Sequence, residues 1–266
     1  MKGLEADIRG QGPPVVLLHG QPGSAADWAR LVSLLEGDFT VIAPDRPGYG
    51  RTGGTAVGFR ANAEAVVCLL DRLGLASAMI VGHSWSGGVA LALAEDHPQR
   101  VASLVLVCSV GPAEVLSRLD RLLAIPPVGS AVAAVALNLA GAVLSLPPVR
   151  QYVDRRVRGT SDESLAAMAD AWRAGHVWRS YVIEQRALVH ELPALGPGLA
   201  AVQAPTAVVV GGADKIVPPA TGERLAASIP GARLVCVPGV GHLLPRERPD
   251  TVAAAVREVN GRAAAD

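Results

Sequence analysis

The chain has 266 residues, of which 50% are hydrophobic and 18% are charged. This composition suits one large domain with a substantial core, or one domain with a sizeable insertion, and it argues against a disordered chain. Twenty-four Lys and Arg residues balance 24 Asp and Glu residues, so the net charge provides no reason to expect nucleic acid or an anionic membrane as a partner.

The N-terminal stretch MKGLEADIRGQGPP lacks the apolar centre of a signal peptide. Cys68, Cys108 and Cys236 are odd in number and lie among Val and Leu residues, so we expect small core hydrophobes of a reducing compartment. Both observations predict a cytoplasmic protein.

Short apolar runs alternate with segments of helical length. Six runs are predicted to be strands: 14–20, 39–45, 77–83, 103–109, 206–212 and 232–239. They are continuously apolar, as in a parallel sheet that helices cover on both faces. The pattern predicts an α/β fold with a doubly wound, mostly parallel sheet, and sites in such sheets form beyond the carboxyl ends of the strands.

The alternation stops between residues 111 and 205. That segment contains no strand-like run, and its helical stretches are separated by proline-rich turns. We therefore expect an α/β core domain from 1–110 and 206–266, with 111–205 as a helical cap inserted over the site. Within the cap, the Ala-rich stretch 128–149 is bounded by prolines and is predicted to be a buried or cap helix, not a membrane span.

The stretch VGHSWSGG, residues 81–88, follows a predicted strand and precedes a predicted helix. Small residues around a serine allow the sharp turn that lifts its Oγ to the rim of the sheet. In the pattern G-x-S-x-G, Ser84 fits directly after the strand, with Ser86 at the position of the last glycine. A register centred on Ser86 would lengthen the strand by two residues, so Ser84 is favoured and Ser86 remains the alternative.

Three further motifs place polar groups after other strands. Asp214 lies in VVVGGADKIVP, and His242 lies in the Gly-rich loop VPGVGHLLPRERPD after the last strand. Ser84, Asp214 and His242 thus occur in the order expected for a hydrolytic triad on this architecture. The loop HGQPG can direct the N–H of Gln21 toward the same oxyanion as the N–H of Trp85.

These segments resemble the α/β-hydrolase fold superfamily, in the capped subgroup that includes esterases, cofactor-free haloperoxidases and epoxide hydrolases. HGQPGSAADW, APDRPGYGRT, VGHSWSGG, HPQRVASLVLV, GGADKIVPP and GVGHLLPRERPD occur in the family order over nearly the whole chain. Ser86 and Pro47 depart from the family pattern, and neither occupies a triad position. Epoxide hydrolases and haloalkane dehalogenases carry an aspartate nucleophile, so Ser84 argues against both activities.

Several residues have competing interpretations. Glu114 is a rival acid, although it lies farther from its strand than Asp214. Asp45 is expected to order its loop, and Arg46 and Arg51 are expected to be solvated.

The candidate substrate pocket comprises two histidines near the site, for which structural roles are also expected, and four aromatic residues of the cap. These are His19, His83, Tyr152, Trp172, Trp178 and Tyr181.

The predicted function is a serine hydrolase that cleaves a carboxylic ester, or a related acyl bond, of a small to medium apolar substrate. Perhydrolase or haloperoxidase-like activity and carbon–carbon bond hydrolysis would use the same triad. A ligand-binding protein with negligible turnover is the alternative of another class. We expect a small-molecule substrate, no cofactor, no metal, no nucleic acid and no membrane partner, and self-association is left open.

Overall fold

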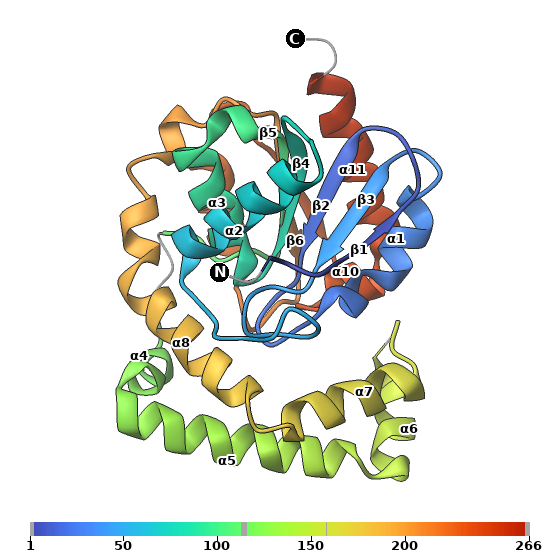
Figure 1. The fold of residues 1–266 in the computed structure, drawn as a ribbon, viewed down its shortest axis with the longest axis vertical. Coiled ribbons are helices and arrows are strands. Elements are labelled where there is room, and N and C mark those ends of the chain that lie inside the picture. The colour runs from blue at the N-terminus through green and yellow to red at the C-terminus, as the bar shows by residue number, and fades with distance from the viewer. Residues whose placement is uncertain (1–2, 113–115, 158, 264–266) are drawn as a thin grey trace.

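The computed structural model describes residues 3–112, 116–157 and 159–263. Its centre is a seven-stranded sheet with the strand order β1-β3-β2-β4-β5-β6-β7 (Figure 1). Every neighbouring pair is parallel except β1 and β3, which are antiparallel. The predicted doubly wound, mostly parallel α/β sheet is therefore confirmed.

All six predicted strands are present, and a seventh precedes them. The strands are β1 (Ala6–Arg9), β2 (Pro14–Leu18), β3 (Thr40–Pro44), β4 (Ala78–His83), β5 (Val101–Val107), β6 (Thr206–Gly211) and β7 (Arg233–Val237). Strand β1 was not predicted, because it is short and mostly exposed and therefore has no apolar run. The prediction that the last strand is buried was wrong, because β7 forms the sheet edge and most of its residues are exposed or half-buried.

Helices cover both faces of the sheet because alternate strand residues point in opposite directions. Val16, Leu18 and Ile80 face one apolar cluster, and Val15, Leu17 and Val81 face the other. The first face carries α2 (Phe59–Arg72), α3 (Ser86–Asp96) and α9 (Pro219–Ser228). The second carries α1 (Ala29–Leu35), α10 (Leu244–Glu247) and α11 (Pro249–Ala263), together with the 3-10 helix Ala25–Trp28.

A second layer of helices lies at one end of the sheet (Figure 1). It comprises α4 (Arg118–Ala124), α5 (Pro126–Leu144), α6 (Pro147–Arg156), α7 (Asp162–Arg173) and α8 (Val177–His190). Within this layer, Leu144, Leu165 and Ala169 form a small apolar cluster that is separate from the two clusters of the sheet. The last part of the inserted segment packs on the core domain instead. Residues of α8 and of the 3-10 helices Leu192–Leu195 and Leu199–Ala201 belong to the apolar cluster around α2 and α3. In the described part of 111–205 the chain forms helices and turns without strands.

The prediction that all three cysteines are core residues was wrong for two of them. Cys108 is buried, whereas Cys68 and Cys236 are exposed. Cys68 lies on the outer surface of α2, and Cys236 lies on the edge strand β7, so neither has a second layer of structure over it. All three are free thiols.

Candidate active site

Ser84 lies in a sharp turn between β4 and α3. Its φ is +56°, a left-handed conformation that non-glycine residues rarely adopt. The Ser84 N–H donates to the carbonyl of Val107, and the Ser84 carbonyl accepts from the N–H of Val110. The neighbouring strand therefore holds the strained turn that presents this serine at the rim of the sheet.

The residues around Ser84 must be small because backbone segments approach one another closely. A Cβ on Gly82 would lie 2.7 Å from the Ser86 carbonyl oxygen, and a Cβ on Gly87 would lie 1.7 Å from the Ser109 Oγ. Ser86 is fully buried, and its Oγ donates to the carbonyl of Leu18 and accepts from the His83 N–H. Ser86 thus supports the turn, and the register centred on it does not fit this geometry.

The side chains of Ser84, His242 and Asp214 form a continuous hydrogen-bonded row. His242 Nε2 lies 2.8 Å from Ser84 Oγ, and His242 Nδ1 lies 2.7 Å from Asp214 Oδ2. The other Asp214 oxygen accepts from the N–H groups of Ile216 and Val217 at 2.8 and 3.0 Å. Burial would raise the pKa of Asp214, but the bonds from His242 and these two amides outweigh it, so this pKa is lowered and the carboxyl is charged. The rival acid Glu114 lies outside the described residues.

His83 positions the loop that carries His242. Its Nε2 donates to the His242 carbonyl oxygen at 3.0 Å, and the two rings lie 5.1 Å apart between centroids. Burial, with a further contribution from His242, lowers the pKa of His83 to about 3, so the ring is neutral at physiological pH. His83 is therefore a fixed hydrogen-bond donor beneath the row.

The fold also brings Cys108 next to Asp214 and His242, with one potential metal-ligand atom of each within 4.8 Å of the others. Spacing along the chain does not reveal this grouping, because the three residues are far apart in the sequence. His242 and Asp214 already bond to each other, and burial raises the pKa of Cys108, which keeps the thiol protonated and a poor ligand. The donor set fits a hydrogen-bonded triad better than a cation site.

The peptide group between Gly20 and Gln21 is fixed by hydrogen bonds to its carbonyl oxygen. Its carbonyl oxygen accepts from Arg46 Nη2 at 2.8 Å and from His19 Nδ1 at 2.9 Å. In a trans peptide the N–H points opposite to the carbonyl, so the Gln21 N–H points away from Arg46. Gly20 also approaches Ser84 so closely that a Cβ would lie 3.2 Å from the Ser84 Cβ.

Trp85 supplies the second amide considered for the oxyanion. Its N–H is at the start of α3, where helix N–H groups have no partner within the helix. The indole is 1% exposed, stacks on Phe59 with centroids 4.3 Å apart, and donates its Nε1–H to the Glu184 carbonyl oxygen at 3.0 Å. Among the described residues, the N–H groups of Gln21 and Trp85 have no hydrogen-bond acceptor.

Arg46 is the largest departure from expectation in the site. It was expected to be solvated, yet it is 1% exposed and forms an ion pair with the fully buried Glu184 of α8. Its guanidinium carbon lies 4.6 Å from the Trp85 ring centroid, and Tyr49 donates to the second Glu184 oxygen at 2.7 Å. The prediction failed because Glu184 is 138 residues away along the chain.

The other charged residues of this loop follow expectation. Arg51 is 56% exposed in its side chain. Asp45 accepts from the N–H groups of Ala25 and Arg51, so its carboxylate orders the loop.

A cavity of about 300 Å³ opens in front of Ser84 Oγ. Its walls are predominantly apolar and come from the core and from α7. The lining residues are Gly20, Gln21, Pro22, Asp27, Trp28, His83, Ser84, Met168, Trp172, Ile216, His242, Leu243, Pro245 and Arg246. Of the predicted pocket residues, His83 and Trp172 are in this wall. Met168, Ile216 and Leu243 also line the cavity and were not predicted, although Ile216 and Leu243 belong to the acid and histidine motifs.

Four predicted pocket residues do not line the cavity. Tyr152 is 59% exposed on α6, where its ring lies beneath the Arg156 guanidinium. Trp178 is half-buried beside Arg179 on α8. Tyr181 contributes its backbone carbonyl, which accepts from Gln21 Nε2 at 2.8 Å. His19 is fully buried behind the Gly20 peptide, and its Nε2 accepts from the Arg46 N–H at 3.0 Å. These corrections follow from the direction of side chains, which periodicity does not specify.

A neighbouring cavity of about 250 Å³ shares Pro22, Asp27, Met168, Trp172 and Arg246 with the first. An ion pair between Arg246 Nη2 and Asp27 Oδ1, at 2.5 Å, is part of both walls. Burial raises the pKa of Asp27 in spite of this cation. The two charged side chains that both walls share are therefore paired with each other, and most of the remaining surface is apolar.

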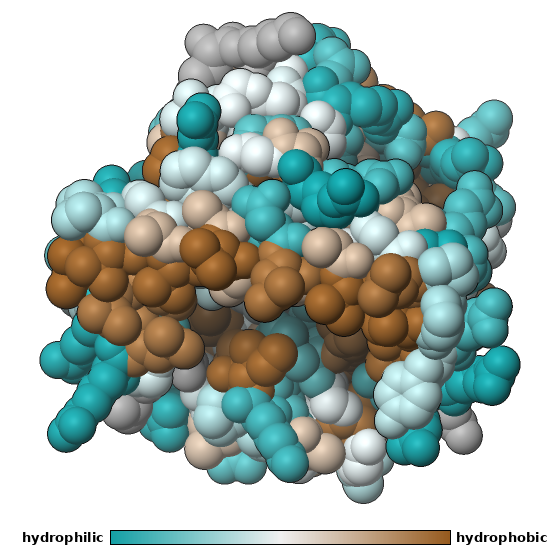
Figure 2. All heavy atoms as spheres, turned by 90° about the horizontal axis from the view of Figure 1, so that it is seen from below, coloured by the Kyte–Doolittle hydropathy of each residue, from teal (hydrophilic) through white to brown (hydrophobic). Residues whose placement is uncertain are grey.

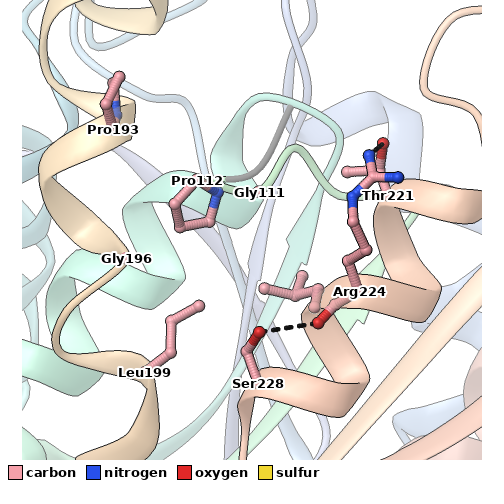
Figure 3. Close-up of a pocket in the computed structure, with 9 residues that line it drawn as sticks. Gly111, Pro112, Pro193, Gly196, Leu199, Thr221, Arg224 and Ser228 are labelled. Atoms are coloured by element: carbon pink, nitrogen blue, oxygen red, sulfur yellow. Dashed lines mark hydrogen bonds between the residues drawn. The ribbon is translucent and has the colours of Figure 1, made fainter. Parts of the chain in front are cut away.

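Another cavity, of about 230 Å³, lies between α9 and the 3-10 segments after α8 (Figure 3). Gly111, Pro112 and Leu199 line one part of it, and Arg224 and Ser228 line the α9 side. Ser84, Asp214 and His242 do not line it. The Ser228 hydroxyl donates to the Arg224 carbonyl within the helix, so this cavity adds no reactive group.

Comparison with known proteins identifies the family. Residues 15–255 match the Alpha/beta hydrolase family. The chain belongs to this family. A serine at a strand-to-helix turn, an acid and a histidine at the carboxyl ends of strands are features that the alpha/beta hydrolase architecture brings together.

Among curated alpha/beta hydrolases, the chain is 31% identical over 260 residues to a non-heme haloperoxidase of Rhodococcus erythropolis, covering 92% of this chain and 91% of that protein. It is 26% identical over 261 residues to a 2-hydroxy-6-oxo-6-phenylhexa-2,4-dienoate hydrolase of Burkholderia cepacia, covering 91% and 85%. A solved esterase from Thermogutta terrifontis is 25% identical with a TM-score of 0.77, covering 98% of this chain and 93% of that one. These relatives are hydrolytic and related enzymes, and this chain is an alpha/beta hydrolase enzyme.

Proposed function

We propose that this alpha/beta hydrolase is a serine hydrolase that cleaves a carboxylic ester, or a related acyl bond, of a small to medium apolar substrate. The observation that carries the proposal is the row of hydrogen bonds from Ser84 Oγ through His242 to Asp214, at 2.8 and 2.7 Å. These distances are within the range required for proton transfer between a nucleophile and a general base.

In this mechanism His242 Nε2 takes the proton from Ser84 Oγ as the oxygen attacks the substrate carbonyl. Asp214 holds the imidazole with its Nδ1–H toward the carboxylate and stabilises the imidazolium. The N–H groups of Gln21 and Trp85 receive the oxyanion. His242 then protonates the leaving alcohol, and a water molecule releases the acyl group from Ser84 by the reverse sequence.

The cavity supports an apolar substrate. Met168, Trp172, Ile216 and Leu243 form much of its wall, and the charged pair of Asp27 and Arg246 is satisfied internally. A volume of about 300 Å³ is at the small end of ligand pockets, which suits a short or medium acyl group.

A second candidate on the same triad is perhydrolysis, in which peroxide replaces water as the acceptor of the acyl group. The specific support is the 31% identity to a protein named as a non-heme haloperoxidase. Carbon–carbon bond hydrolysis has similar support from the relative in Burkholderia cepacia. Rates with acetate and peroxide, compared with rates for aryl esters, separate perhydrolysis from ester hydrolysis.

The test is labelling with a fluorophosphonate probe, followed by mass spectrometry of the modified peptide. We expect the probe on Ser84 and its loss in His242→Ala, because the hydroxyl needs the base to react. A panel of aryl esters with increasing acyl length then measures the size of the pocket.

The neighbouring serine serves as an internal control, since Ser84 and Ser86 occur in one peptide and can be distinguished by fragmentation. Modification of Ser86 would contradict the proposed register. Absence of labelling in folded protein would indicate a ligand-binding role, which tight binding insensitive to Ser84→Ala would then support.

A further inference from the structure

The outer face of α5 presents a row of large apolar side chains to solvent. Val128, Val132, Val135, Leu139 and Val143 are between 38% and 68% exposed. Their spacing of three or four residues places them along one side of the helix. The opposite side packs against α7 and α8 through the buried residues Gly129, Ala133, Gly141 and Leu144.

This row continues onto the adjoining helices. We call the whole set the cap stripe; its members are Leu119, Leu122, Ile125, Val128, Val132, Val135, Leu139, Val143 and Leu146. Figure 2 shows it as a nearly continuous hydrophobic band across the face of the cap. Single exposed apolar residues are common on protein surfaces, but a contiguous band of this kind usually marks an interaction site.

Positively charged side chains lie on the two helices that adjoin α5, namely α4 and α6. The segment 118–156 contains five arginines and two aspartates, and α5 itself has no charged residue. Arg118 and Arg121 are exposed at the α4 end, and Arg155 and Arg156 are exposed at the α6 end. Among the described residues, no carboxylate forms a salt bridge with any of these four guanidinium groups.

We propose that the cap stripe docks on the surface of an anionic lipid bilayer, with α5 lying flat in the interface. The apolar side chains would enter the boundary between headgroups and acyl chains, and the arginines would contact lipid phosphates. Although α5 is long and apolar enough to span a membrane, one side of it is packed against α7 and α8, which favours lying on the surface. A local excess of arginine decides this interaction, so the net charge of zero does not argue against it.

A second copy of the chain is the alternative occupant. A two-fold dimer through α5 would bring arginine-bearing ends of the two stripes together whether the helices ran parallel or antiparallel, since both ends are positive. Repulsion between these ends disfavours self-association, whereas an anionic headgroup layer complements both ends at once.

The test is co-sedimentation with lipid vesicles, using Ser84→Ala as the parent protein so that binding is independent of the proposed hydrolysis. We expect the protein to pellet with vesicles of phosphatidylcholine and phosphatidylglycerol and to bind phosphatidylcholine alone more weakly. Val135→Glu with Leu139→Glu should lower the partition coefficient by at least about tenfold, because two charges would enter the apolar layer. Glutamate is a good helix former, so the helix itself is retained.

The matched control is Leu34→Glu with Leu234→Glu, which adds the same two negative charges at exposed leucines of the α/β domain, outside the cap stripe. This control should bind vesicles as the parent does. Arg121→Gln with Arg155→Gln should lower the partition coefficient on anionic vesicles by about tenfold or more, because each basic residue contributes to attraction at the surface. Most of the preference for anionic over phosphatidylcholine vesicles should then be lost.

Three outcomes would overturn the proposal. One is the absence of vesicle binding by folded protein. Another is binding that the two glutamates leave unchanged and salt abolishes, since this would be simple charge attraction. The third is a stable dimer in light scattering that Val135→Glu with Leu139→Glu converts to monomer, which would make a second copy the occupant.

Discussion

Helices α3 and α5 have similar compositions but opposite surroundings. Both consist largely of Ala, Val, Leu and Gly. In α3, Val89, Leu91 and Leu93 are 0% exposed, whereas Val135 and Leu139 of α5 are 68% and 62% exposed. The core supplies α3 with a sheet on one side and α2 on another, while half of α5 has no partner within the described chain. The composition of an apolar helix therefore indicates that its surface will be covered. It does not tell whether the covering residues belong to the same chain, as for α3, or to another molecule, as we propose for α5.

The site also combines residues of the α/β domain with residues of the inserted helices. The proposed reacting groups come from loops of the sheet, and Met168 and Trp172 of the cap form part of the wall around them. We therefore expect core substitutions to change the chemical step and cap substitutions to change recognition.

Ser84→Ala should lower kcat for an aryl ester by about 10⁴- to 10⁶-fold without unfolding the protein, because the nucleophile is lost. Trp172→Ala, in the cap wall, should mainly raise KM. Steady-state kinetics of both variants measure the contrast. A Trp172 variant that loses kcat as severely as the Ser84 variant would place part of the chemistry in the cap.

Leu91→Ala should reduce the free energy of unfolding by about 2–5 kcal/mol, because it leaves a cavity among fully buried side chains. Leu139→Ala removes the same atoms from an exposed position and should change it by about 0.5 kcal/mol or less. Urea denaturation of each variant gives both values. Similar losses at the two positions would show that the cap stripe is covered in solution.

Arg46→Lys should lower kcat by about 10- to 100-fold while KM changes little. The lysine keeps the charge, but it cannot reach Glu184, Gly20 and the His19 carbonyl together, so the Gln21 N–H would be less firmly directed. Kinetics and thermal unfolding are measured together. Loss of stability with unchanged kcat would assign Arg46 a purely structural role.

The lowered pKa of His83 predicts a dependence of stability on pH. The pKa of His83 is about 3 in the folded protein against 6.5 as its ordinary value, so the unfolded chain binds more protons between these pH values. The contribution of His83 to the free energy of unfolding is therefore fully present above about pH 6.5. It is lost as pH falls toward 3, by at most about 1.4 kcal/mol per pH unit. Denaturation at several pH values measures the slope, which His83→Gln should reduce. An unchanged slope in that variant would contradict this assignment.

The fold was largely predictable from the sequence because buried parallel strands consist of uninterrupted apolar runs. Strands β2 to β6 have this pattern, whereas β1 is exposed and antiparallel, and half of its four residues are charged. The lack of strands in the described part of 111–205 was predictable from its lack of apolar, β-branched runs. Which side of α5 faces outward was not, because apolar residues occur on both sides of this helix: Ala133 and Leu144 are buried, whereas Val135 and Leu139 are exposed.

That Ser84, Asp214 and His242 lie together was predictable for a different reason. Ser84 follows β4 directly, and Asp214 and His242 lie in the loops after β6 and β7. The carboxyl ends of parallel strands meet at one edge of the sheet. The buried ion pair of Arg46 and Glu184 could not be predicted, since it depends on how α8 packs over the loop after β3. The cap aromatics show the same limit: Trp172 reaches the cavity, while Tyr152 on the next helix is exposed.

The position of Glu184 has a consequence for protein engineering. Because α8 holds Arg46 and Trp85 through Glu184, and Gln21 through Tyr181, the last cap helix is joined to the loops that frame the proposed oxyanion site. Replacing 111–205 as one cassette from a relative would remove these supports together with the substrate walls. A chimera that exchanges α4 to α7 and retains the native chain from Val177 onward would change selectivity while leaving the amide donors in place.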